Sequence, residues 1–227
     1  MMEEIDSRKN GIHLFALNIG PRLLKWESDA FLLKLPFEDQ YIISRYKHWS
    51  DRQRALLAKV LIRWVIRKLT FVNHIQIDRN ETGRPYLVND EHWSGDFNLS
   101  HSGDWIIAAL TNKGYVGVDV EKIHYVDEDV MAYALSVAEL QLVNLKPKQD
   151  RLVLFYELWT MKEAIYKTGL FPNTTPKSLD TIQLLSNCKD IYTQRFYIDH
   201  NHPVSLCYNV EHPVVQLTTL NRNQLIE

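Results

Sequence analysis

Residues 51–69 constrain the fold most, because their apolar side chains recur at intervals of three and four. This spacing places them on one face of an α-helix. Ser50 comes just before the segment and is a suitable N-cap. We interpret the apolar face as one that packs on a hydrophobic core; it comprises Leu56, Leu57, Val60, Leu61, Trp64 and Val65, with Lys68 at its end.

Strand-like segments and further helices surround this one. Alternating or β-branched stretches bounded by turn residues predict strands, and periodic stretches predict helices. The predicted strands are 13–19, 75–78, 85–88, 105–111 and 115–121, with more strands near the C-terminal end, and the predicted helices are 130–145 and 152–168. Each half then holds one strong helix plus strands, which predicts an α+β fold in two parts joined near Gly114.

The composition excludes several classes of protein. The chain has 227 residues, a net charge of -2 and a pI of about 6.5, so it has no overall positive charge to hold a nucleic acid or an anionic membrane. Its cysteines, Cys188 and Cys207, are too few for a disulfide framework. No stretch reads as a secretory signal or as a membrane span. We expect a cytoplasmic protein without a nucleic-acid or membrane partner.

Asp119 and Glu121 form a candidate metal pair. They lie in the predicted strand 115–121, and side chains two residues apart in a strand point to the same side. Carboxylate oxygens of this kind suit Mg²⁺. The pair taken alone also fits an exposed strand edge with two solvated acids.

The predicted helix 152–168 adds further charged side chains and ends at Gly169. Glu163 and Lys167 are four residues apart and share a face, with Lys162 next to Glu163. An ordinary surface ion pair would explain Glu163 and Lys167 equally well.

Two polar turns complete the set of candidates. Ser100 and His101 lie where a strand runs into a turn, and both can donate hydrogen bonds to a phosphate. The turn of residues 79–85 carries Arg79 and Arg84. Either feature alone would also fit a surface hairpin.

Taken together, these four elements resemble the Sfp-type 4'-phosphopantetheinyl transferases. The family patterns are G-(R/K)-P, N-x-S-H-S, (V/I)-G-(V/I)-D-(V/I)-E and W-x-x-K-E-(A/S)-x-x-K. The chain has them in this order as Gly83-Arg84-Pro85, Asn98-Leu-Ser-His-Ser102, Val116-Gly-Val-Asp-Val-Glu121 and Trp159-Thr-Met-Lys-Glu-Ala-Ile-Tyr-Lys167. The helix 51–69 also resembles the first helix of the family.

The resemblance implies an enzyme that transfers the phosphopantetheine arm of coenzyme A to a serine of an apo-acyl or apo-peptidyl carrier protein and releases 3',5'-ADP. It implies Mg²⁺ held by Asp119, Glu121 and Glu163, with Glu163 also as the base for the serine hydroxyl. Lys167 would act in catalysis and also contact coenzyme A, and the other implied coenzyme A ligands are Lys162, Ser100, His101, Arg79, Arg84 and Pro85. Arg45 ranks first as the ligand of the 3'-phosphate. Glu139 would support the site.

The resemblance also implies two similar α+β subdomains related by a pseudo-two-fold axis. Residues 1–113 would contact coenzyme A, residues 114–227 would carry the metal ligands and catalytic helix, and the active site would lie in the cleft between them. A single chain would then be complete, so we expect a monomer, of the type usually tied to secondary metabolism. The residues Thr168-Gly-Leu-Phe-Pro172 depart from the family's G-x-G after the helix. An inactive carrier-binding relative and a different Mg²⁺-dependent phosphoryl or nucleotidyl enzyme remain as alternatives.

Overall fold

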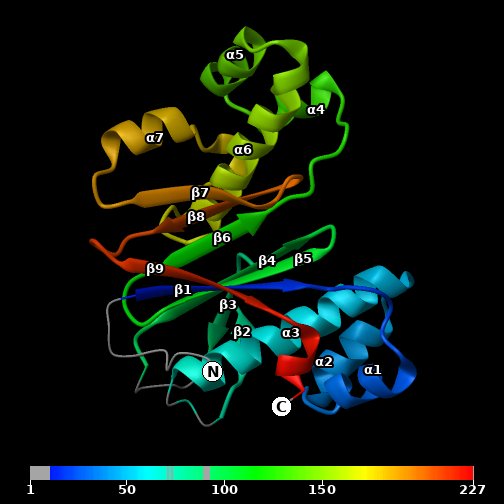
Figure 1. Cartoon of the computed structure of the whole chain (residues 1–227). Coiled ribbons are helices and arrows are strands. Elements are labelled where there is room, and N and C mark those ends of the chain that lie inside the picture. The colour runs from blue at the N-terminus through cyan, green and yellow to red at the C-terminus, as the bar shows by residue number, and fades with distance from the viewer. Residues whose placement is uncertain (1–10, 71, 73, 89–92, 227) are drawn as a thin grey trace.

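A computed structural model describes residues 11–70, 72, 74–88 and 93–226, and these residues form four layers (Figure 1). Helices cover one face of a four-stranded sheet, and a three-stranded sheet packs on its other face. A long helix covers the outer face of the second sheet. The prediction of an α+β fold is confirmed.

Most strands belong to these two sheets. The first sheet has the order β4-β5-β1-β9, with β1 (Gly11–Asn18), β4 (Asp96–Ser102), β5 (Trp105–Thr111) and β9 (Val214–Leu220). The second has the order β6-β8-β7, with β6 (Val116–Val120), β7 (Tyr192–Asp199) and β8 (His202–Tyr208). A separate hairpin consists of β2 (Ile77–Arg79) and β3 (Pro85–Leu87).

The helices divide between the outer faces of the two sheets. Those on the side of the first sheet are α1 (Lys25–Leu32), α2 (Phe37–Ser44) and α3 (Trp49–Leu69). Those on the side of the second sheet are α4 (Glu128–Ala134), α5 (Val137–Leu145), α6 (Lys148–Lys167) and α7 (Thr181–Asn187). Short 3₁₀ turns occur at Pro176–Ser178 and Arg222–Leu225. Within the described residues, no helix combines the length and the apolar composition that crossing a bilayer requires.

The C-terminal strand returns to the first sheet. β9 pairs in parallel with β1, whereas β1 and β5 are antiparallel. Leu220 and Leu225 therefore belong to the core under α3. A division near Gly114 separates β5 from β6, but β9 lies with the elements that precede Gly114.

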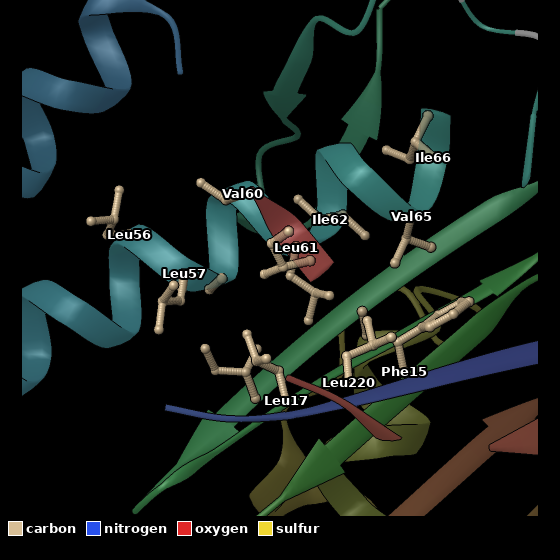
Figure 2. Packing of buried hydrophobic residues seen from close by; sticks show 14 of the residues in the cluster. Phe15, Leu17, Leu56, Leu57, Val60, Leu61, Ile62, Val65, Ile66 and Leu220 are labelled. Atoms are coloured by element: carbon tan, nitrogen blue, oxygen red, sulfur yellow. The ribbon is translucent and has the colours of Figure 1, made fainter. Parts of the chain in front are cut away.

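The α3 helix packs on the first sheet through the apolar face predicted from its spacing. Figure 2 shows that face directed at β1 and at Leu220 of β9. Successive side chains of β1 alternate between two cores: Phe15 and Leu17 face α3, whereas Leu14 and Ala16 face the second sheet. Burial on both faces explains why β1 reads as an almost continuous apolar run.

The predicted elements differ from the structure in several places, which include the unpredicted helix α7. The prediction of a single helix over residues 130–145 is wrong. This segment forms α4 and α5, which are separated at Leu135 and Ser136. Ser136 accepts a hydrogen bond from the backbone N–H of Glu139, and the Glu139 carboxylate accepts from the backbone N–H of Ser136. This reciprocal capping box starts a new helix. The short α1 and α2 were not predicted, because each buries a single residue and so shows no apolar stripe.

Candidate active site

Strands β4 and β6 join the two sheets through side chains. β6 lies at the edge of its sheet, and two of its backbone N–H groups donate to β4 side chains instead of to a strand. Val116 donates to Asp96 Oδ2 at 2.8 Å, and Val118 donates to Asn98 Oδ1 at 3.1 Å. Asp96 and Asn98 are both buried. These bonds fix the register of one half of the molecule against the other.

The next two residues on this face of β4 reach the predicted metal ligands. Ser100 Oγ donates to Asp119 Oδ1 at 2.7 Å, and Ser102 Oγ donates to Glu121 Oε2 at the same distance. Asp119 and Glu121 therefore face β4 together, as the alternation of side chains in a strand requires. Ser100 lies beside the carboxylates rather than in a separate phosphate loop.

Gly117 brings α6 close to these carboxylates. A Cβ atom at this position would lie 2.1 Å from the carbonyl oxygen of Ala164 and 2.8 Å from the backbone nitrogen of Thr168. Only glycine therefore permits the last turns of α6 to pack on β6 at this separation. Lys167 Nζ then lies 2.6 Å from Asp119 Oδ1 and 3.1 Å from Ser100 Oγ.

The charges in this cluster perturb one another. Burial, together with the negative charges of Asp119 and Glu121, raises the pKa of Glu163 to about 7, although Lys167 acts in the opposite direction. Burial and the charge of Asp119 also raise the pKa of Glu121. Burial alone would lower the pKa of Lys167, but the three carboxylates outweigh it and raise that pKa. A carboxylate with a pKa near neutrality is suited to accept a proton.

The carboxylates of this cluster are chemically suited to bind a divalent cation. Asp119 Oδ2 is buried without a hydrogen-bond partner among the described residues, and such an atom is costly unless a ligand satisfies it. No group of three His, Cys, Asp or Glu side chains forms a ready metal site within the described ranges. Mg²⁺ usually keeps several waters and takes only one or two protein carboxylates directly, so a smaller set suffices.

Lys162 does not belong to this cluster, and its prediction as a coenzyme A ligand is wrong. Its side chain is fully buried, pairs with Glu139 Oε2 at 2.5 Å and donates to the carbonyl oxygen of Leu179. Adjacent residues on a helix point about 100° apart, so Lys162 and Glu163 leave α6 in different directions. Glu139 is also fully buried. The pair connects α5 to α6 and to residue 179 and lies outside the carboxylate cluster.

Arg84, another predicted coenzyme A ligand, uses part of its guanidinium within the protein. It donates to Asp96 Oδ2 at 2.5 Å and to the carbonyl oxygens of Lys167 and Val116 at 2.7 and 3.2 Å. The side chain therefore ties the end of α6 to the β4–β6 junction.

A cavity of about 390 Å³ lies on the other side of β4 from Ser100, between α2, α3 and the β2–β3 hairpin. It brings together three predicted ligands: Arg79, Pro85 and His101. Burial, followed by the positive charges of Arg54 and Lys167, lowers the pKa of His101. Because neighbouring residues of a strand point to opposite sides, Ser100 and His101 serve two regions of one site.

The predicted Arg45 is not among the residues that line this cavity. It is exposed, and its guanidinium donates to the hydroxyl of Tyr41 at 3.1 Å. The cations that α3 presents to the cavity are Lys59 and Arg63. The sequence analysis did not single them out, although their spacing of four residues places both on one helical face.

The chain is similar to known proteins over most of its length. A family model described as "4'-phosphopantetheinyl transferase, N-terminal" matches residues 21–113, and one described as "4'-phosphopantetheinyl transferase superfamily" matches residues 115–220.

Three relatives are described as 4'-phosphopantetheinyl transferases. The chain is 30% identical to 4'-phosphopantetheinyl transferase psf-1 of Bacillus pumilus over 75% of this chain and 77% of the relative. It is 29% identical to 4'-phosphopantetheinyl transferase Sfp of Bacillus subtilis over 68% of each chain. It is 34% identical to 4'-phosphopantetheinyl transferase gsp of Aneurinibacillus migulanus over 57% of this chain, and this match spans only 54% of the relative. On these matches, the chain belongs to the 4'-phosphopantetheinyl transferase superfamily.

Proposed function

We propose that this chain transfers the 4'-phosphopantetheine arm of coenzyme A to a serine of an apo-acyl or apo-peptidyl carrier protein. The observation that carries the proposal is the Asp119 cluster. One buried carboxylate accepts hydrogen bonds from Ser100 and Lys167, keeps one oxygen free and lies near Glu163, whose pKa is about 7. Pyrophosphate chemistry needs such a combination of positive charge, cation ligands and a base.

The cavity at His101 supports the placement of the coenzyme. The β4 strand presents Ser100 to the carboxylates and His101 to the cavity, so a ligand that passes over this strand can contact both. The adenosine end would occupy the cavity with Arg79, Pro85 and His101. The pyrophosphate would lie beside Lys167 and Ser100, and the pantetheine arm would lead to the incoming carrier.

The transfer is a displacement at the phosphorus that bears the pantetheine arm. The carrier serine oxygen forms a bond to this phosphorus, and the bond from phosphorus to the bridging oxygen breaks. Glu163 accepts the serine proton, and 3',5'-ADP leaves with the bridging oxygen. Lys167 places a positive charge beside Asp119, where negative charge develops on the phosphates.

Asp119, Glu121 and Glu163 would hold Mg²⁺ in this site. The ion would supply Lewis-acid stabilisation of charge on the pyrophosphate oxygens. Because β4 contributes from one half of the molecule and β6 and α6 from the other, one chain holds every residue proposed here. We therefore propose that the enzyme works as a monomer in the cytoplasm.

The function can be tested with a panel of apo-carrier proteins from fatty-acid, polyketide and nonribosomal-peptide systems. Each carrier is incubated with the chain, coenzyme A and Mg²⁺, and its intact mass is measured. We expect at least one carrier to gain the mass of one phosphopantetheine group. If no carrier gains mass while the chain still binds carriers, the alternative of an inactive carrier-binding relative is correct.

A further inference from the structure

The cavity at His101 carries balanced charges. Its lining contains three carboxylates and three permanently cationic groups: Glu38, Asp39, Asp78, Lys59, Arg63 and Arg79. His101 adds no full positive charge at neutral pH, because its pKa is lowered from an already near-neutral value. A cavity that selects a dianionic phosphate normally presents unpaired arginine or lysine side chains. In this one, two of the three cations are already paired with a carboxylate.

Asp39 accounts for most of this compensation. Its Oδ1 lies 2.7 Å from Lys59 Nζ, and its Oδ2 lies 2.7 Å from Arg63 Nη2. The three side chains are largely shielded from solvent, with 14%, 26% and 11% of the Asp39, Lys59 and Arg63 side chains exposed. One carboxylate from α2 therefore holds both α3 cations.

The remaining cation of the lining, on Arg79, is also partly engaged. Its Nη1 donates to the carbonyl oxygen of Gly83 at 2.5 Å, and the neighbouring Asp78 lines the same cavity. A phosphate entering here would have to compete with Asp39 for Lys59 and Arg63 or share Arg79 with Asp78. The first contact would replace existing ion pairs, and the second would place the phosphate beside the Asp78 carboxylate, so either contact would add little net binding energy.

We infer that, because of Asp39, this cavity binds the nucleoside end of coenzyme A with similar affinity whether or not the ribose carries a 3'-phosphate. The chain would then accept coenzyme A and its 3'-dephospho form with similar efficiency. The inference rests on the proposed function, because it places the nucleoside end of coenzyme A in this cavity. It concerns the specificity of this chain, which the charge of the cavity determines, and Asp39 is the specificity-determining residue.

Direct binding tests the inference without turnover. The dissociation constants of adenosine 5'-monophosphate and adenosine 3',5'-bisphosphate are measured calorimetrically on the full chain at one fixed ionic strength. Since a compensated ion pair contributes little, we expect the two constants to differ by less than about fivefold. A bisphosphate preference of more than about thirtyfold would overturn the inference and leave the proposed function standing. If the wild type binds neither nucleotide, the placement of coenzyme A in the cavity fails, and the inference fails with it.

The Asp39→Asn variant tests the residue itself. Asparagine keeps the shape of the side chain but releases the charge of Lys59 and Arg63, so the preference for the bisphosphate should rise by at least about tenfold. Glu38→Gln is the matched control: it removes the same charge from the same cavity at an exposed position, and it should change the ratio by less than about twofold. An unchanged ratio in folded Asp39→Asn, or an equal rise in both variants, would overturn the role of Asp39. The ratio of kcat/KM for coenzyme A and 3'-dephospho-coenzyme A should follow the binding ratio.

Discussion

Replacement of Lys162 by methionine tests the difference between a structural and a catalytic lysine on one helix. Methionine keeps most of the apolar stem but removes the ammonium group that pairs with Glu139 and donates to the carbonyl oxygen of Leu179. Glu139 would keep its bonds from the backbone of Ser136 and from the N–H and hydroxyl groups of Thr181. It would nevertheless lose its only fully buried positive partner among the described residues.

The expected cost is large because both side chains of the pair are fully buried. Removal of one partner from a buried ion pair destabilises a protein by about 3–5 kcal/mol. For a domain of this size, each kcal/mol lowers the melting temperature by about 2–4 °C, so Lys162→Met should lower it by about 6–20 °C. The double variant Lys162→Met with Glu139→Gln should be more stable than Lys162→Met alone, since no uncompensated buried charge remains.

Thermal unfolding and carrier modification, measured on the same preparations, separate the two roles. Below its melting temperature, Lys162→Met should modify the carrier at a rate within about tenfold of the wild type, because the side chain touches no part of the proposed site. Lys167→Met, which removes the cation beside Asp119, should lose at least about a hundredfold in rate. An unchanged melting temperature for Lys162→Met together with a rate loss as large as that of Lys167→Met would refute this reasoning. Such a result would restore Lys162 as a phosphate ligand.

The remaining predictions concern the packing and the charge of the carboxylate cluster. Gly117→Ala would place a Cβ atom 2.1 Å from the carbonyl oxygen of Ala164, so urea denaturation should show a loss of about 1–3 kcal/mol. Without metal, the pKa of Glu163 is raised from 4.5 to about 7 in the folded state, so the folded chain binds more protons than the unfolded chain between these values. The contribution of Glu163 to the free energy of unfolding should therefore fall as pH rises through this window. This contribution should be absent from Glu163→Gln. An identical pH dependence of stability in both proteins would contradict the assigned pKa. Mg²⁺ competes with that proton, so its stabilising effect in thermal unfolding should be larger at about pH 8 than at about pH 6, and equal effects at both values would separate Glu163 from the metal.

The sequence predicted best those features that depend on side-chain periodicity. The unbroken apolar face of α3 identified the helix to within two residues at its start. The alternation of side chains in β6 placed Asp119 and Glu121 on one side, and the structure shows both of them bonded to serines of β4. These features are local, so three-and-four spacing or alternation is enough to find them.

The sequence predicted poorly those features that depend on which buried partner a charged side chain finds. Lys162 was grouped with Glu163 because the two are adjacent in the sequence, and its pairing with Glu139 requires knowing that α5 packs on α6. Arg84 was predicted as a coenzyme A ligand because it matches the family pattern and lies in a basic turn, whereas its contacts with Asp96 and Lys167 come from distant segments. The Ser136-Val-Ala-Glu139 capping box was visible in the sequence and would have divided the helix predicted for 130–145.

Asp119 offers the most direct test of the account as a whole. We would measure the initial rate at which an apo-carrier protein gains phosphopantetheine by intact mass, for the wild type, Asp119→Ala and Lys162→Met, with coenzyme A and Mg²⁺ in excess. The account predicts that Asp119→Ala, confirmed as folded by circular dichroism, loses at least about a thousandfold in rate, whereas Lys162→Met stays within about tenfold. Transfer by Asp119→Ala at a rate close to that of the wild type would contradict the carboxylate cluster as the active site.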